Sequence, residues 1–115
     1  AHTFVFMKNG FAVAKVDEGG NKLVVLLNEE GQTVAEMSLG QNPCMMLSCG
    51  EKIYVDSGFG LSEETRMLYA LNEDGKELGK IAVPDDYGYM LGADHDGVYY
   101  WETAEQMKLV RIEPK

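Results

Sequence analysis

The sequence predicts an all-β protein made of repeated antiparallel sheets, and three observations support this class. A hexapeptide occurs twice, because Leu-Asn-Glu-Glu-Gly-Gln at residues 27–32 returns as Leu-Asn-Glu-Asp-Gly-Lys at residues 71–76, 44 positions later. Helical periodicity is almost absent, since residues 61–65 have a capping-box pattern but no apolar stripe follows them. The rest of the chain consists of short runs rich in Val, Tyr, Leu, Met and Phe, broken by Gly, Asn and Asp.

The first predicted sheet opens with a strand that turns at Asn9 and Gly10, because an Asn-Gly pair readily supplies positive φ. A polar loop at residues 17–21 separates its second and third strands, and the first hexapeptide joins the third strand to the fourth. A link at residues 40–43 leads to the next unit. The four strands are expected at residues 3–7, 11–16, 22–27 and 33–39.

The second and third units repeat this order. The second unit has a turn at residues 50–52, a longer loop at residues 58–65 and the second hexapeptide. Its strands are expected at residues 44–49, 53–57, 66–71 and 77–83. After a link at residues 84–88, the third unit has a turn at residues 94–97 and ends without a fourth strand. Its strands are expected at residues 89–93, 98–102 and 107–113.

The units align beyond the repeated hexapeptide. Residues 46–47 and 90–91 are both Met-Leu, and Ile-Tyr-Val at residues 53–55 corresponds to Val-Tyr-Tyr at residues 98–100. A period of about 44 residues with four short strands per unit is typical of β-propeller blades. One such sheet cannot bury both of its faces alone, so neighbouring blades must cover them. Within one region at residues 1–115, two complete antiparallel four-stranded blades are expected at residues 3–39 and 44–83, and an incomplete blade at residues 89–113.

Three motifs carry a resemblance to a known family: the Asn-Glu-Asp-Gly-Lys turn at residues 72–76, the link from Pro84, and Asp-His-Asp-Gly at residues 94–97 before Val-Tyr-Tyr. This pattern resembles the repeats of six-bladed β-propellers of the NHL and TolB-like type. The resemblance covers residues 3–113 and implies a fold rather than a ligand, because its motifs are turn residues. It also implies a secreted or periplasmic bacterial protein.

The number of units implies missing partners. Propeller rings contain about four to eight blades, whereas this chain supplies two complete units and three strands of a third. We expect either the C-terminal part of a larger propeller or copies that complete a ring, with two chains making six blades. A free monomer would expose unpaired strand edges and apolar faces. A further architecture is a self-contained β-sandwich or an open stack of three curved sheets, which would cap both outer faces with its own side chains.

The charge balance argues against two classes of partner. Nineteen acidic residues against ten basic residues give a formal net charge of −9, whereas nucleic acids and anionic membranes require clustered Lys and Arg. No apolar run approaches the roughly 18 residues that span a bilayer, and no signal peptide is visible. Because the first residue is Ala, we expect that a leader or tag was removed or that residue 1 is not the natural start.

Residues that suggest a metal or a catalytic group have simpler structural interpretations. Cys44 and Cys49 are separated by an odd number of positions, so they are expected to point to opposite faces as unbridged core residues. Asp94, Asp96 and Gly97 resemble the start of a calcium loop without its later ligands, and a tight hairpin favours the same residue types. We therefore predict no metal, no cofactor and no catalytic residue.

The predicted binding residues lie on the face that carries the links and the long loops, opposite the hairpin turns. Aromatic rings beside carboxylates suit a sugar or peptide ligand through stacking and hydrogen bonds. The alternative is that the rings pack over the sheets while the acids face solvent. The candidate binding residues are Phe59, Glu63, Asp85, Asp86 and Tyr87.

Three consecutive aromatic residues lie in the expected strand at residues 98–102. Alternation directs Tyr99 and Trp101 to one face of the sheet and Tyr100 to the other. Core packing between adjacent blades is one interpretation, and an exposed aromatic patch for a partner is the other.

These features favour a non-catalytic binding or scaffold module of β-propeller type that recognises a protein, peptide or glycan. The alternative is part of a propeller enzyme, a lyase or hydrolase, whose catalytic groups lie in missing blades. Self-association of the chain, or contact with the remaining blades of the same protein, is expected in either case.

Overall fold

The computed structural model describes residues 4–39, 45–57, 66–84, 87–102 and 108–115. These residues form β-strands and no helix, which confirms the predicted all-β class. Accordingly, none of them belongs to a helix that could cross a membrane. The strands are β1 (Phe4–Met7), β2 (Gly10–Val16), β3 (Lys22–Asn28), β4 (Thr33–Ser38), β5 (Met45–Cys49), β6 (Lys52–Asp56), β7 (Met67–Asn72), β8 (Glu77–Ala82), β9 (Tyr87–Ala93), β10 (Val98–Glu102) and β11 (Lys108–Ile112).

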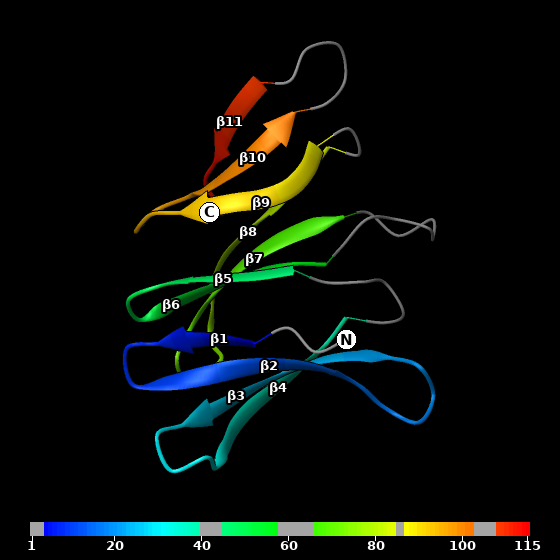
Figure 1. The fold of residues 1–115 in the computed structure, drawn as a ribbon, viewed down its shortest axis with the longest axis vertical. Coiled ribbons are helices and arrows are strands. Elements are labelled where there is room, and N and C mark those ends of the chain that lie inside the picture. Colours follow the sequence, from blue (N-terminus) through cyan, green and yellow to red (C-terminus); the bar gives the residue numbers. More distant parts are fainter. Residues whose placement is uncertain (1–3, 40–44, 58–65, 85–86, 103–107) are drawn as a thin grey trace.

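The strands form three antiparallel sheets in which strands adjacent in sequence are adjacent in space. Sheet 1 has the order β1-β2-β3-β4, sheet 2 the order β5-β6-β7-β8, and sheet 3 the order β9-β10-β11. The sheets are stacked along the longest axis of the molecule (Figure 1). Among the described strands no sheet closes on itself. The fold is therefore a series of three meanders.

The repeated hexapeptide forms the same turn in sheets 1 and 2. Oδ1 of Asn28 accepts hydrogen bonds from the backbone N–H groups two and four residues later, at 3.0 and 2.9 Å. Asn72 does the same, with both distances 2.9 Å. Gly31 (φ 80°) and Gly75 (φ 85°) then adopt the left-handed conformation that glycine tolerates without steric cost. The hairpin predicted from the repeat is confirmed in both places.

Two details of the prediction were wrong. Gly10 does not have a positive φ; it is the first residue of β2, where an added Cβ would overlap the carbonyl oxygen of Leu27. Glycine is needed there because β3 approaches closely, not because the turn is left-handed. In addition, β9 begins at Tyr87 rather than at residue 89, since a register shift allows Tyr87 to pair with Glu102 of β10.

Each sheet buries a face against the next sheet. We call the face turned toward the following sheet in the chain the forward face, and the opposite face the backward face. Because side chains alternate along a strand, Val55 of β6 points back to sheet 1 while Tyr54 points forward to sheet 3. The core between sheets 1 and 2 contains Ala12, Ala14, Val24, Leu26, Leu39, Met46, Ile53, Val55 and Leu71. The core between sheets 2 and 3 contains Tyr54, Leu68, Ala70, Val83, Val98 and Tyr100.

The sheets approach one another most closely at their first strands. β1 lies beside β5, and β5 lies beside β9. The backbone N–H of Lys8 donates to the carbonyl oxygen of Gly50 at 2.9 Å, and the hydroxyl of Ser48 donates to the carbonyl of Phe6. No later strands of neighbouring sheets, among those described, lie in comparably close contact. The sheets therefore diverge from a common side formed by β1, β5 and β9.

Candidate functional site

Four of the five predicted binding residues, Phe59, Glu63, Asp85 and Asp86, lie outside the described residues, as does Cys44. Tyr87 is described and is half-buried at the start of β9. Its ring lies 5.8 Å from the ring of Tyr100, measured between centroids. The side chain thus packs against the core between sheets 2 and 3, which is the packing alternative considered for the rings. Cys49 is half-buried and unbridged.

A buried ion pair lies beside Tyr87 and was not anticipated from the sequence. Nη2 of Arg66 is 2.7 Å from Oδ2 of Asp56, and the two side chains are 1 % and 0 % exposed. The Tyr100 hydroxyl donates to the same oxygen at 2.6 Å. Arg66 also donates to the backbone carbonyls of Tyr87 (2.6 Å) and Gly88 (2.8 Å). One guanidinium therefore joins the end of β6 to the first strand of sheet 3.

This network is structural in character. Burial of the ring raises the pKa of Tyr100 above its ordinary value, so the hydroxyl stays protonated and donates to Asp56. Arg66 lies 5.4 Å from the centroid of the Tyr100 ring, measured from Cζ, close enough for a cation–π contact. Because protein groups enclose the ion pair, the charges of Asp56 and Arg66 neutralise each other and are not available to bind a ligand.

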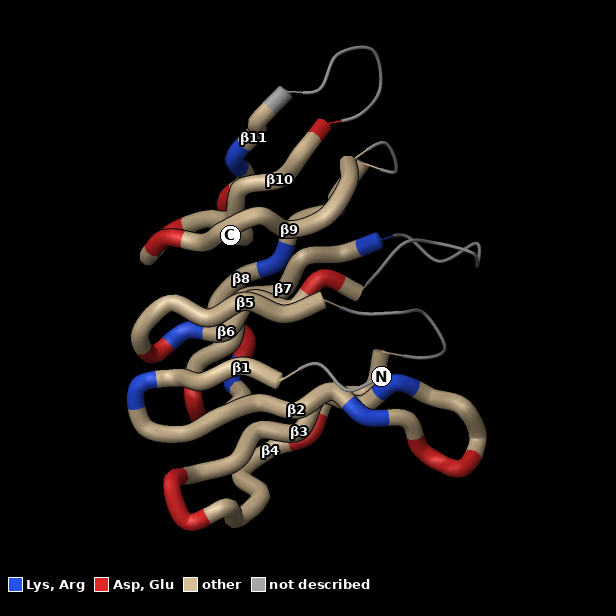
Figure 2. The backbone as a smooth tube through the Cα atoms, viewed as in Figure 1, with Lys and Arg blue, Asp and Glu red and all other residues tan. Residues whose placement is uncertain are grey.

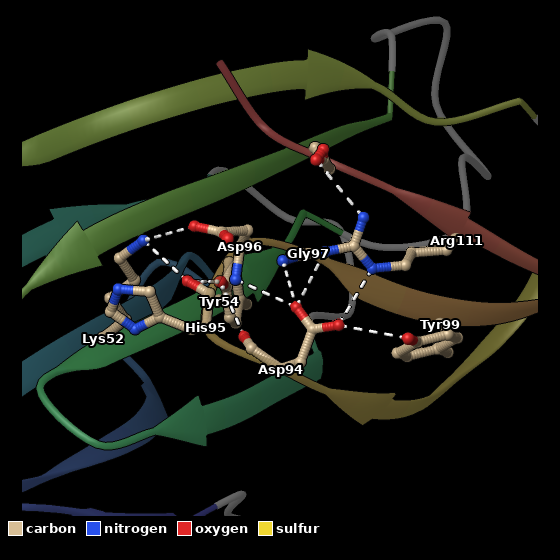
Figure 3. Close-up of polar contacts among 9 residues, drawn as sticks. Lys52, Tyr54, Asp94, His95, Asp96, Gly97, Tyr99 and Arg111 are labelled. Atoms are coloured by element: carbon tan, nitrogen blue, oxygen red, sulfur yellow. Dashed lines mark hydrogen bonds and ion pairs between the residues drawn. The ribbon is translucent and has the colours of Figure 1, made fainter.

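A second polar cluster organises the β9–β10 turn (Figure 3). The Asp94 carboxylate accepts two hydrogen bonds from Arg111, both 2.9 Å long, and one from the Tyr99 hydroxyl at 3.1 Å. The hydrogen bonds from Arg111 lower the pKa of Asp94, and the same contact raises the pKa of Arg111. Asp94 also accepts the backbone N–H groups of Asp96 and Gly97 at 2.9 Å each. The Asp-x-Asp-Gly sequence therefore serves the turn and the neighbouring strand.

The same turn is attached to sheet 2. The Tyr54 hydroxyl donates to the backbone carbonyls of Asp94 (3.0 Å) and His95 (2.9 Å). Nζ of Lys52 donates to the His95 carbonyl at 2.7 Å. Burial raises the pKa of Tyr54 to about 12, so its hydroxyl remains a donor at neutral pH. These contacts connect the forward face of sheet 2 to the first turn of sheet 3.

The turns of sheets 1 and 2 lie together, and an open cavity of about 400 Å³ lies between them. The backbone N–H and Nδ2 of Asn9 donate to the Glu73 carboxylate at 2.7 and 2.9 Å. Asn28 and Asn72, which also line the cavity, use their side chains to hold their own turns. Asn9, Asn28, Asn72 and Glu73 thus use their side chains to hold the turns, and we do not assign a ligand to this cavity.

The backward face of sheet 1 is largely apolar, and none of the described sheets packs against it. Phe4 and Phe6 of β1 are 47 % and 72 % exposed. Their ring centroids are 4.8 Å apart in an edge-to-face arrangement, and Phe11 lies 5.5 Å from Phe4. Register places further apolar residues beside them on the same face. The rows across the sheet are Phe6, Phe11 and Leu27, and Phe4, Val13 and Val25.

The forward face of sheet 3 is its counterpart at the other end of the stack. Leu109 of β11 is 55 % exposed and pairs with Trp101 of β10. Tyr99 and Trp101 are half-buried, whereas Tyr100 between them is fully buried on the other face. Tyr89 of β9 is 66 % exposed. The predicted alternation therefore produces both a core residue and an outward aromatic patch.

Few charged residues lie on these faces: Glu36 continues the row of Val25 on sheet 1, and Arg111 pairs with Tyr99 on sheet 3, with Cζ 5.8 Å from the centroid of the Tyr99 ring. In Figure 2, acidic residues gather at the turns and at the ends of strands, and most of the strand backbone carries neither charge. The two uncovered faces are the backward face of sheet 1 and the forward face of sheet 3. Contiguous exposed apolar surface of this kind marks interaction sites on proteins. We take the two faces as the candidate functional site.

Comparison with protein-family models, curated proteins and solved structures gives no match to this chain. Its function is therefore argued from the two uncovered faces and from the packing between the sheets.

The sequence analysis missed two groups of residues, one in the core and one in the candidate site. The pairing of Asp56 with Arg66 has a weak signal in the sequence, since both residues are charged and lie at the ends of apolar segments on either side of residues 58–65. The aromatic cluster has a clearer one, because Phe4 and Phe6 alternate in one strand and Phe11 opens the next. An expected hairpin with that spacing directs all three rings to one face.

Proposed function

We propose that this chain is a non-catalytic, protein-binding scaffold module of β-propeller type. The observation that carries the proposal is that both ends of the sheet stack present apolar, aromatic faces equivalent to those buried within it. Such faces gain free energy when another protein surface covers them. Trp, Tyr and Phe are also enriched in protein interfaces, as at Phe6, Tyr89 and Trp101.

Three features support interpretation of the sheets as propeller blades. Each sheet is a meander in sequence order, sheets 1 and 2 share one turn design, and the first strands β1, β5 and β9 lie side by side. Sheets that diverge from a common side form a ring when more of them are added. In this proposal the chain supplies consecutive blades, and other protein surface supplies the rest.

The nature of the exposed groups favours a protein over a glycan. Sugar sites combine an aromatic ring with several convergent polar groups. On the end faces, however, the aromatic residues are accompanied by aliphatic neighbours such as Val13, Leu27 and Leu109. The nearest strong polar groups, Asp94 and Arg111, already bind one another.

Affinity capture with matched variants tests the proposal. Wild-type protein and three Lys variants are used as baits in an extract of the source organism, and retained proteins are identified by mass spectrometry. Phe6→Lys alters the backward face, Leu109→Lys alters the forward face, and Leu78→Lys is a control because Leu78 is 46 % exposed on β8. We expect partners that Leu78→Lys retains and one or both face variants lose. Partners or glycans bound equally by all four baits would contradict the proposal.

A further inference from the structure

We infer that the partner is a second copy of this chain, whose sheet 1 docks its backward face on the forward face of sheet 3. The inference rests on the proposed function and deepens it by naming what covers the end faces. The contact is head-to-tail, because the surface that one copy contributes differs from the surface that the other copy contributes.

The first argument is continuity with an interface that the chain already uses twice. Leu26 on the forward face of sheet 1 belongs to one core with Val55 on the backward face of sheet 2. Ala70 on the forward face of sheet 2 belongs to one core with Val98 and Tyr100 on the backward face of sheet 3. Both interfaces are forward-to-backward, and the three described sheets leave one face of each kind without a described neighbour. A second copy brings the missing face in each case.

The second argument concerns Tyr54 and Tyr99, which occupy equivalent positions 45 residues apart on the forward faces of sheets 2 and 3. The Tyr54 hydroxyl donates to backbone carbonyls of the first turn of the following sheet, at Asp94 and His95. Tyr99 carries the same hydroxyl at the corresponding place, held by Asp94 (Figure 3). Because the Tyr99 hydroxyl donates its single proton to Asp94, it would offer an acceptor oxygen to the first turn of sheet 1 in a second copy, at Lys8 and Asn9.

The third argument comes from two equivalent turns. A Cβ added to Gly75 would overlap the side chain of Ala35, because the turn of sheet 2 packs on sheet 1. A Cβ added to Gly31 would meet nothing within 4 Å. The space beside the turn of sheet 1 is therefore the place that a preceding sheet would fill.

The geometry of the first strands favours closure. Because β1, β5 and β9 share one side of the stack, repeating the same contact bends the assembly instead of extending it in a line. A head-to-tail contact that bends forms a closed ring when the rotation completes a circle. Two copies, each with three sheets, form the smallest such assembly, in which both end faces of each copy are covered.

A mixing experiment distinguishes this contact from any other. Light scattering after size-exclusion chromatography measures the mass of wild type, Phe6→Lys, Leu109→Lys and Leu78→Lys over a concentration series. We expect wild type and Leu78→Lys to rise from 12.7 kDa to twice that value. Each face variant alone associates at least about tenfold more weakly, because an unpaired Lys is costly to bury. In an equimolar mixture, the intact backward face of Leu109→Lys meets the intact forward face of Phe6→Lys, so the mixture regains one of the two contacts of the ring and associates more strongly than either variant alone.

Several results would overturn the inference. A wild-type mass fixed at 12.7 kDa, a face variant that associates like wild type, a mixture that associates no more strongly than either variant alone, or loss of association in Leu78→Lys would each do so. We expect the variants to fold, because Phe6 and Leu109 are exposed, and circular dichroism measures whether they do. If wild type is monomeric while another protein is captured through the end faces, the inference fails and the proposed function stands. If neither occurs, both fail.

Discussion

At the scale of single residues, Gly31 and Gly75 show how the same turn acquires different constraints. Both have a positive φ in equivalent positions, but Gly75 lies against sheet 1 and Gly31 lies in open space. The conformational requirement is local and could be predicted from the sequence. The packing requirement depends on a strand 40 residues away, at Ala35.

Substituting each glycine with Ala separates the two effects. Gly31→Ala is expected to lower the free energy of unfolding by about 1–2 kcal/mol, the cost of a left-handed conformation for an L-residue. Gly75→Ala is expected to lower the free energy of unfolding by about 1–3 kcal/mol more than Gly31→Ala does, because the added methyl overlaps Ala35. Urea denaturation of the two variants measures the difference. Equal losses would show that the turn of sheet 2 does not pack on sheet 1 as described.

Asp94 gives a prediction that depends on pH. Asn at this position keeps an oxygen for the turn N–H groups and removes the charge that binds Arg111. Because Arg111 lowers the pKa of Asp94 below its ordinary value of 3.8, the contact stabilises the folded state above that pH. The stabilisation is lost as pH falls through the lowered pKa.

Asp94→Asn is therefore expected to be less stable than wild type at neutral pH, with a difference that narrows as pH falls below about 3.8. Thermal unfolding over a pH series measures it, and added salt should reduce the neutral-pH difference. A difference that is unchanged at acidic pH would mean that the Asp94 charge is not what stabilises the turn.

At the scale of elements, the Asp56–Arg66 pair holds sheet 2 to sheet 3. Arg66 binds the Asp56 carboxylate and two backbone carbonyls at the start of β9, and Tyr100 completes the network. Removing one partner of such a buried pair leaves an uncompensated charge or polar group. This costs far more than losing an exposed ion pair.

Tyr100→Phe and Arg66→Met test the network. Tyr100→Phe removes only a hydroxyl that donates to a carboxylate, so a loss of about 1.5–3 kcal/mol is expected. Arg66→Met leaves Asp56 buried without its cation, so the free energy of unfolding is expected to fall by about 3–5 kcal/mol. Tyr69→Phe, at a half-buried residue of β7, is the control and should cost less than Tyr100→Phe. Chemical denaturation ranks the three, and any other order would contradict the assigned role of the network.

Strand positions could largely be predicted, because turn residues act locally. Asn28 and Asn72 could be predicted to form hairpin turns because their side chains accept hydrogen bonds from backbone N–H groups of the same turn. Long-range contacts could not be predicted: Gly10 is required by the approach of Leu27, and Arg111 reaches Asp94 across sheet 3. For the candidate site, Tyr87 packs against Tyr100 because β9 starts earlier than expected. The sequence indicated uncovered apolar faces, but only the strand register identifies their residues.

At the scale of the whole molecule, the net charge and the apolar end faces have opposite effects on the association of two copies. The chain carries a formal net charge of −9, so two copies repel, while their uncovered faces attract. Raising the NaCl concentration shortens the range of the repulsion and leaves apolar contact intact. Association measured by sedimentation velocity is therefore expected to strengthen several-fold between low and moderate salt. Weaker association in salt would indicate that ion pairs, not the apolar faces, hold the copies together.

The central claim, that the two end faces are the contact surfaces, is tested most directly by nuclear magnetic resonance of isotopically labelled chain across a dilution series. Trp101 is a convenient reporter because it is the one Trp in the chain and lies on the forward face of sheet 3. Concentration-dependent shifts are expected at Trp101 and Leu109 and at Phe4 and Phe6, while the core of sheet 2 stays unchanged. Shifts confined to one of the two faces or to the turns, or spectra that do not depend on concentration, would contradict the claim.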